Sequence, residues 1–213
     1  SVTYGNGQYV AVADSGDDRI MTSPDGITWT GRSALGNDET WAGVTYGNGL
    51  FVAVANTGTG NRVMTSPDGI TWTIRTSAAD NNWRGVTYGN GLFVAVSDSG
   101  TGNRVMTSPD GITWTSRTSA ADNAWYDMTY GNGLFVAVSI SGSGNRVMTS
   151  PDGITWTIRT GINNSTWRSV TYGNGTFVAV ADDTSVMTSP DGVTWTNRFT
   201  TYLNLWQSVT YAN

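Results

Sequence analysis

The sequence contains no cysteine, no histidine and no lysine, and its only glutamate is Glu39. Without cysteine the chain has no disulfides, no thiol nucleophile and no thiolate metal ligand. Without histidine it also lacks the most common general base and metal ligand. All 11 basic residues are arginine, against 16 acidic residues, and the net charge is −5. Nucleic acids bind basic surfaces, so this balance predicts no nucleic-acid partner.

Long apolar runs are also missing. No stretch approaches the roughly 18 consecutive apolar residues that a membrane-spanning helix needs, so we predict no membrane insertion. Charged residues make up only 13% of the chain. Its solubility must therefore depend largely on threonine, serine, asparagine and glycine.

The chain does contain an internal repeat of about 42 residues. The segment Ser-Pro-Asp-Gly-x-Thr-Trp occurs five times, and a second tryptophan opens each following unit. The first series is Trp29, Trp72, Trp114, Trp156 and Trp195, and the second is Trp41, Trp83, Trp125, Trp167 and Trp206. A unit of this length cannot bury a core alone, so the repeats must share one. We therefore predict a single domain over residues 1–213, made of five repeats and a sixth copy of the first strand at residues 206–213.

Each repeat reads as four short strands, which we name a to d. In the second repeat they are expected at residues 44–46, 50–55, 62–66 and 71–75. Gly47-Asn48-Gly49 between a and b is typical of a tight hairpin turn. In the c–d turn, Pro67 presets its own φ, Asp68 can accept bonds from nearby amides, and Gly69 tolerates a positive φ.

Strand b decides the fold class. Phe51, Ala53 and Ala55 face one side while Val52 and Val54 face the other, so both faces are apolar and both should be covered. Four-stranded sheets that repeat at this period and pack face to face are the blades of a propeller. We predict an all-β fold, a five-bladed β-propeller of four-stranded repeats. A β-sandwich and an open solenoid are the alternatives, although a solenoid needs capping units and the terminal repeats here resemble the middle ones.

The first strand has one copy too many for five blades. One end of the chain can complete the blade at the other end and displace the spare copy. Alternatively, the spare strand can pair with a neighbouring molecule and support self-association. Asn6-Gly7 favours the N-terminal copy locally, whereas the C-terminal copy has its opening Trp206. The sequence does not decide between these interpretations.

The segment Thr-Ser-Pro-Asp-Gly-Ile-Thr-Trp-Thr resembles the Asp-box, or bacterial neuraminidase repeat, whose pattern is Ser-x-Asp-x-Gly-x-x-Trp. Here Asp68 and Gly69 are adjacent, so the box is one residue shorter in all five copies. The resemblance covers essentially the whole chain. It implies a propeller with the box at the c–d turn, on the face away from any site. It implies little about activity, because Asp-box propellers serve many functions.

The two ends of the repeats differ in variability. The a–b and c–d turns are nearly invariant, whereas the b–c and d–a loops vary, as expected of a binding face on a rigid frame. Short acids, amides and arginines at that end suit sugar hydroxyls, which need paired donors and acceptors. The candidate ligand-binding residues are Asp38, Asp80, Asp122, Asn164, Arg62, Arg104, Arg146 and Asn82. Arginine at a strand end also commonly pairs with loop carbonyls or a nearby Asp, so a structural role is the alternative.

The function predicted from these patterns is a non-catalytic binding module, most plausibly multivalent and lectin-like, with a glycan or other small polar ligand at the loop face. One alternative is a structural or surface-assembly module that uses the spare strand. Another is a degenerate sialidase-like hydrolase, for which Asp38 and Asp80 are the available carboxylates. Catalytic sites are usually asymmetric, whereas these positions repeat, so we predict no enzymatic activity. We expect no cofactor and no metal, and an extracellular or surface-associated location.

Overall fold

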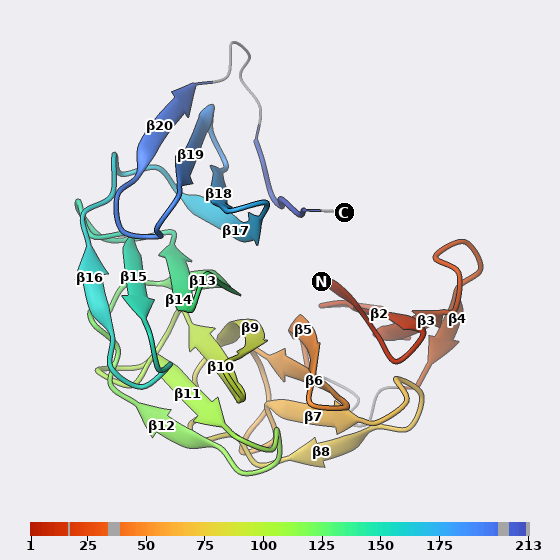
Figure 1. Ribbon diagram of the computed structural model, residues 1–213. Coiled ribbons are helices and arrows are strands. Elements are labelled where there is room, and N and C mark those ends of the chain that lie inside the picture. Colours follow the sequence, from red (N-terminus) through yellow and green to blue (C-terminus); the bar gives the residue numbers. More distant parts are fainter. Residues whose placement is uncertain (17, 34–38, 200–204, 212–213) are drawn as a thin grey trace. The chain divides into compact units, whose positions relative to one another are not determined.

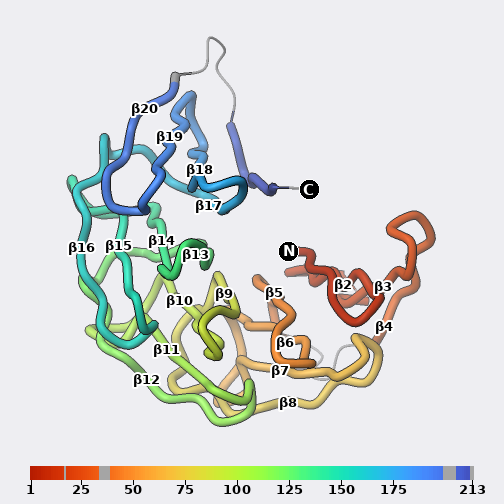
Figure 2. Tube along the Cα trace, viewed as in Figure 1, coloured from red at the N-terminus to blue at the C-terminus, as the bar shows by residue number. Residues whose placement is uncertain are grey.

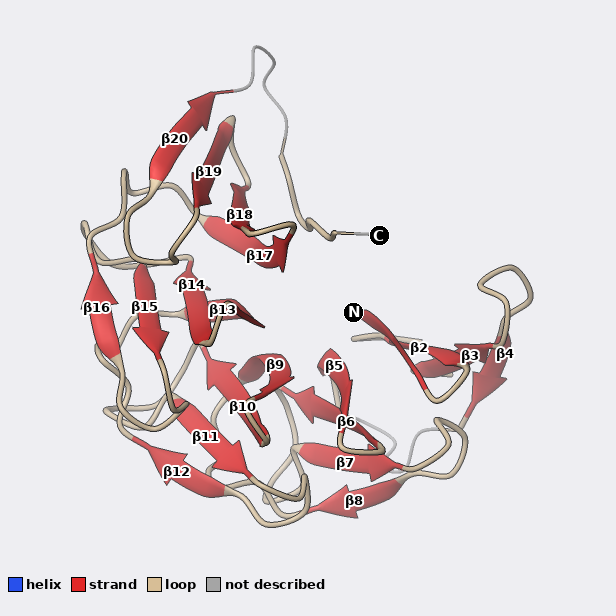
Figure 3. Cartoon of the chain, viewed as in Figure 1, coloured by secondary structure: helices blue, strands red, loops and turns tan. Residues whose placement is uncertain are grey.

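The computed structural model describes residues 1–16, 18–33, 39–199 and 205–211. Within them the regular structure is entirely β-strand, as Figure 3 shows. Contacts between residues divide the chain into two compact units, Ser1–Ala95 with Met106–Ser116, and Val96–Val105 with Arg117–Asn213. The predicted single domain is not tested by this division and stays a prediction.

The strands form five antiparallel four-stranded sheets, each of consecutive strands, labelled in Figure 1. Blade 1 contains β1(Val2–Gly5), β2(Gln8–Val12), β3(Ile20–Ser23) and β4(Thr30–Arg32). Blade 2 contains β5(Trp41–Gly47), β6(Leu50–Ala55), β7(Val63–Ser66) and β8(Thr73–Arg75). Blade 3 contains β9(Trp83–Gly89), β10(Leu92–Ser97), β11(Val105–Ser108) and β12(Thr115–Arg117). Blade 4 contains β13(Trp125–Gly131), β14(Leu134–Ser139), β15(Val147–Ser150) and β16(Thr157–Arg159). Blade 5 contains β17(Trp167–Gly173), β18(Thr176–Ala181), β19(Ser185–Ser189) and β20(Thr196–Phe199).

The predicted strand bounds were exact for strand b and shifted for the others. Strand a begins at Trp41 instead of Val44, because a β-bulge between Trp41 and Gly43 lets the ladder continue to the pair Trp41↔Ala55. Strand d begins at Thr73 instead of Thr71, because Ile70 N–H and Thr71 N–H donate to the Asp68 carboxylate and not to a neighbouring strand. Strand c begins one residue late, at Val63, although the Arg62 carbonyl still accepts from Ala55 N–H at 3.0 Å.

The a–b turns form as the sequence predicts. Asn48 has φ 48° and Gly49 has φ 76°, and the equivalent residues of the other four repeats have the same signs. Two successive positive φ values match the twist of the flanking strands in a two-residue hairpin. The turn therefore fixes the register Tyr46↔Phe51 and, with it, which face each side chain takes.

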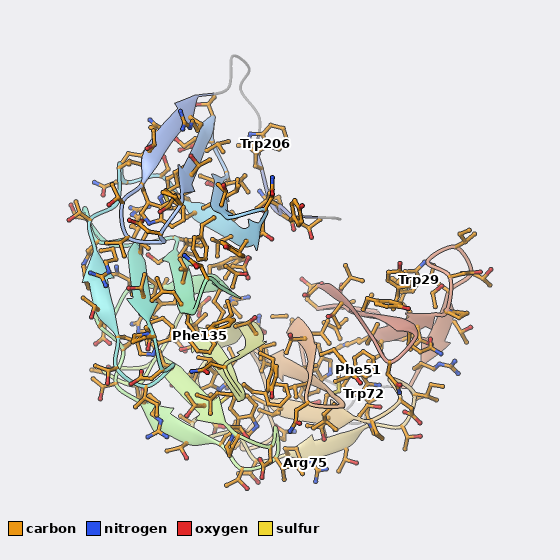
Figure 4. The ribbon with its side chains drawn as sticks, viewed as in Figure 1. Trp29, Phe51, Trp72, Arg75, Phe135 and Trp206 are labelled. Atoms are coloured by element: carbon orange, nitrogen blue, oxygen red, sulfur yellow. The ribbon has the colours of Figure 1, made fainter. Side chains whose placement is uncertain are left out.

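The core lies between neighbouring sheets, and both faces of strand b contribute to it. In the first unit Phe51, Ala53 and Ala55 pack with Trp72 toward blade 1, and Val52 and Val54 pack with blade 3. Phe51 and Trp72 are labelled in Figure 4. In the second unit the corresponding interface joins the valines of blade 4 to the aromatic face of blade 5. The predicted burial on both faces is confirmed, and the fold is a five-bladed β-propeller.

Most of the ten tryptophans are buried. In the opening series Trp41, Trp83, Trp125 and Trp167 are at most 1% exposed, and in the box series Trp72, Trp114, Trp156 and Trp195 are at most 9% exposed. The exceptions lie in the outermost copies: Trp29 is half-buried and Trp206 is 37% exposed.

Candidate functional site

The a–b and c–d turns share one end of each blade, and the b–c and d–a loops share the other, because strand direction alternates. At the first end the box is a closed set of local hydrogen bonds. In blade 2, Asp68 Oδ1 accepts from Ile70 N–H and Thr71 N–H, both at 2.8 Å, and from Ser66 Oγ–H at 2.9 Å. Trp72 Nε1–H donates to Gly69 O at 2.9 Å. The box aspartate is thus a turn former.

These bonds set the charge state of the box carboxylates. The Thr71 amide, supported by the Ile70 amide and the Ser66 hydroxyl, holds the pKa of Asp68 below its usual value, and burial opposes this shift. The pKa values of the equivalent aspartates, Asp25, Asp110, Asp152 and Asp191, are lowered in the same way. This end of the blade carries fixed negative charges that are already engaged with backbone.

At the loop end, the predicted arginines brace the b–c loops. Arg62 donates through Nε to Gly58 O at 2.8 Å, and through Nη1 to Asn56 O and Asn82 Oδ1, both at 3.1 Å. Arg104 makes the equivalent bonds to Gly100 O at 2.8 Å and Asp98 O at 3.0 Å. The structural alternative for these arginines is therefore realised, and Asn82 joins them.

Arg146 braces the loop of blade 4 in the same way, with bonds to Gly142 O at 2.8 Å and Ile140 O at 3.3 Å. It also donates to Ser165 O at 2.9 Å. Burial lowers the pKa of Arg146 below the usual arginine value. Three consecutive blades thus hold their b–c loops with one arginine each.

The predicted acids and amide connect the two loops of one blade. Gly60 N–H donates to Asp80 Oδ1 at 2.6 Å, Gly102 N–H to Asp122 Oδ1 at 2.7 Å, and Gly144 N–H to Asn164 Oδ1 at 2.7 Å. Asp80 also lies 4.0 Å from Arg62 Nε, but its side chain is 46% exposed, so this ion pair contributes little. Asp38 lies outside the described residues.

The structure thus brings Arg62, Asp80 and Asn82 together around Gly58 and Gly60, and their counterparts around the loops of blades 3 and 4. The bonds keep the loops in one repeated shape. Whether a ligand also contacts these residues stays a prediction.

One cluster at this end was missed by the sequence reasoning. Arg168 donates to Asp182 Oδ2 through Nε at 3.0 Å and Nη2 at 2.7 Å, and its guanidinium lies 4.9 Å from the Tyr126 ring centre. The available signal was variation: the residue after the opening Trp differs between repeats, whereas the Thr-Tyr pair later in strand a is constant. Those residues are Ala42, Arg84, Tyr126, Arg168 and Gln207.

A buried carboxylate follows Tyr126. Asp127 accepts from Met128 N–H at 2.8 Å and, across to blade 5, from Val170 N–H at 2.9 Å. Burial raises its pKa, while these amides and Ser169 oppose the rise. Glycine or serine takes this position in the other units, at Gly43, Gly85, Ser169 and Ser208. Asp127 therefore serves packing between two blades.

Residues 205–211 lie along β17, where Figure 2 shows their trace. Val209 N–H donates to Ser169 Oγ at 3.3 Å. Val170 N–H donates to Asp127 from the equivalent position of the preceding repeat. An added Cβ at Gly173 would overlap the Tyr211 ring, just as one at Gly131 would overlap Tyr172. The spare copy thus lies beside blade 5 where strand a of a following blade would lie, although residues 205–211 do not form a regular strand.

No protein-family model and no curated protein matches the sequence. Solved structures do match the fold. A virginiamycin B lyase from Staphylococcus aureus superposes with a TM-score of 0.85 at 14% identity, over 100% of this chain and 74% of its own. YCF48 bound to D1 peptide gives 0.63 at 16% identity, over 92% of this chain. The computationally designed Ika8 protein gives 0.68 at 14% identity, over 100% of this chain.

These likenesses establish the β-propeller fold alone, because all the identities are low. The chain spans less than two thirds of the YCF48 and Ika8 chains, 65% and 64% respectively. The described residues include no helix long and apolar enough to cross a membrane.

Proposed function

We propose that this chain is a non-catalytic binding module that holds several copies of a small polar ligand, a glycan, at its loop end. One observation carries the proposal: the loops of blades 2, 3 and 4 are fixed by the same arginine and the same Asp or Asn. Loops ordered before binding lose little conformational entropy when a ligand arrives. Near-equivalent sites then gain from avidity.

The nearest support from known proteins concerns the frame. One similar propeller is described as bound to the D1 peptide, and another, a catalytically inactive virginiamycin B lyase, was solved with quinupristin. We keep a glycan as the proposed ligand because short acids, amides and arginines gather at the loop end, and sugar hydroxyls need such paired donors and acceptors.

Absence of catalysis is part of the proposal. The inactive form of the lyase carries a substituted histidine, and this chain has no histidine at all. Its glutamate Glu39 is 7% exposed, and its Oε1 accepts from Asn61 Nδ2–H. Glycosidase chemistry needs two carboxylates flanking one bond, and a buried, bonded glutamate is poorly placed for either role.

The assignment to the Asp-box group and the location are also proposals. The box bonds at Asp68 and Trp72 fit a shortened Asp-box, and an extracellular or surface-associated location fits a glycan ligand. The proposed function is tested by a glycan array probed with the full chain, with its solution mass recorded on the same sample. Specific binding by a monomer supports it, and no binding to any glycan overturns it.

A second candidate is a surface-assembly module that pairs through the spare strand. Residues 206–211 hold the place of an inner strand on β17, yet Trp206 is 37% exposed where its four counterparts are at most 1%. A strand of a neighbouring molecule that paired with this segment would cover it. A chain-linked oligomer that becomes monomeric on Trp206→Asp would support this candidate, and a wild-type monomer at all concentrations would exclude it.

A further inference from the structure

A groove of about 480 Å³ lies on the outer rim of the first unit, between the end of β8 and the box segment of blade 3. This volume is within the usual range of roughly 300–1,000 Å³ for small-molecule sites. Arg75, labelled in Figure 4, is part of its lining. The groove is separate from the Arg62 and Asp80 cluster, although the two share one loop.

One wall of the groove is apolar and rigid. It consists of Ile112, which is 43% exposed, and Trp114, which is 8% exposed. The amides of Ile112 and Thr113 both donate to Asp110 Oδ1 at 2.8 Å, and Trp114 Nε1–H donates to Gly111 O at 3.0 Å. The box of blade 3 therefore fixes this wall before any ligand is present.

The opposite wall runs from Ile74 to Ser77 and is mostly polar. Arg75 Nε–H donates to Thr65 Oγ1 at 3.0 Å, which orients the guanidinium. Ser77 N–H donates to Gly60 O at 3.3 Å, and Gly60 in turn donates to Asp80. Asp80 thus contributes to this wall by holding the loop that carries Ser77.

Ser77 is the unusual member of the lining. It is 8% exposed, and among the described residues its Oγ has no hydrogen-bond partner. A buried hydroxyl without a partner costs free energy, and it calls for an explanation. Ser77 lines the groove, so a molecule bound there is an available partner for Oγ. Ser119, in the same position of the next repeat, is also 8% exposed and also lacks a partner.

We infer that this groove is a monosaccharide site, an inference that rests on the proposed function and names its place and ligand class. A neutral pyranose has an apolar ring face, which matches Ile112 and Trp114, and hydroxyls, which match Thr113, Ser77 and Arg75. A purely apolar ligand would leave those polar groups unpaired. An acidic ligand fits the groove less well than a neutral one. The groove offers it a single guanidinium, already oriented by Thr65, and the chain carries a net charge of −5.

Most of the same residue types recur at the equivalent positions of other junctions, except that Ala34 and Gly161 stand where Ser77 stands here. Between blades 1 and 2 they are Arg32, Ile70, Thr71 and Trp72, and between blades 4 and 5 they are Arg159, Val193, Thr194 and Trp195. The apolar residues at these positions are about as exposed as Ile112, because Ile70 is 41% exposed and Val193 is 37% exposed.

The test is a native mass-spectrometric titration of the full chain with the methyl glycosides of glucose, galactose, mannose and N-acetylglucosamine. For one of these sugars we expect Ile112→Asp to reduce the number bound at saturation by one, because it places a charge on the apolar wall. Ile27→Asp is the matched control: it changes the same box position in blade 1, where Ile27 is 85% exposed, and should bind like wild type.

Ser77→Ala provides a second readout that does not depend on disturbing the fold. We expect the melting temperature without sugar not to fall, because the substitution removes a buried hydroxyl that has no partner among the described residues, and the affinity of this one site to fall at least tenfold. Unchanged binding in both variants overturns the groove. If binding then disappears in Asp80→Asn/Asp122→Asn, the proposed function stands without the groove. If no sugar binds the wild type, both fail.

Discussion

The Tyr211 ring packs directly on Gly173, in the same way that the Tyr172 ring packs on Gly131. Only glycine leaves room for it. Gly47 faces Tyr88 in the same manner, but Tyr88 belongs to the interior strand β9, whereas Tyr211 belongs to a segment outside the sheets. The same substitution should therefore have different consequences at the two sites.

We predict that Gly47→Ala destabilises the fold by about 1–3 kcal/mol, the usual cost of overpacking, because Tyr88 cannot move away without disturbing β9. Gly173→Ala should instead release residues 205–211, seen as faster hydrogen exchange at the Val209 amide, with little change in unfolding free energy. Gly161→Ala is the control, since an added Cβ there would have no neighbour closer than 3.6 Å. Unchanged exchange at Val209 in Gly173→Ala would refute the placement of this segment.

Trp72→Ala should cost about 3–5 kcal/mol of unfolding free energy, because it removes a buried aromatic and leaves a cavity. Trp72 is 4% exposed, whereas Trp29 holds the same box position in blade 1 and is only half-buried. Chemical denaturation of both variants should show the smaller loss for Trp29→Ala. Equal losses would mean that the exposed fraction of each tryptophan does not determine how much unfolding free energy its removal costs.

Asp127→Ser should make stability at neutral pH less dependent on pH. Burial raises the pKa of Asp127 in the folded state, so the folded state favours its protonated form. Its contribution to stability is fully present below the pKa of the unfolded state, about 3.9, and is lost as pH rises through the raised pKa of the folded state. The variant copies Ser169 of the next repeat. Its free energy of unfolding in urea should therefore rise relative to wild type as the pH increases from 4 to 7. A constant difference across that range would contradict the sign.

The box aspartates should produce the opposite dependence. The pKa of Asp68 is lowered, chiefly by the Thr71 amide, so its stabilisation is present above the unfolded value and is lost as pH falls through the folded one. Asp68→Asn should cost on the order of 1 kcal/mol at pH 7 by weakening bonds to the carboxylate. The cost should shrink toward pH 2, measured by thermal unfolding. A cost that grows on acidification would rule out this role.

The sequence predicted the turns and strand b well because each is decided locally. Asn48-Gly49 sets the hairpin register, and the double-sided apolar pattern from Leu50 to Ala55 requires sheets on both faces. The ends of strands a and d were less predictable, because a bulge at Gly43 and the bonds to Asp68 shift the ladder by up to three residues.

The candidate site was predicted in part. Arg62, Asp80 and Asn82 do meet, yet their partners are backbone groups of a loop shaped by Gly58 at φ 104° and Gly60 at φ 71°, which composition alone does not specify. The Tyr126 and Arg168 pair joins neighbouring blades 42 residues apart, so no local pattern reveals it. The Ser77 groove likewise needs two blades side by side.

The most direct measurement of the central claim is the number of glycans bound per chain. Native mass spectrometry of the full chain, titrated with the strongest ligand from the array, should give more than one bound ligand with similar affinities, and no cleaved or otherwise altered product. A single bound ligand, or a product whose mass differs from the glycan added, would contradict a multivalent, non-catalytic module.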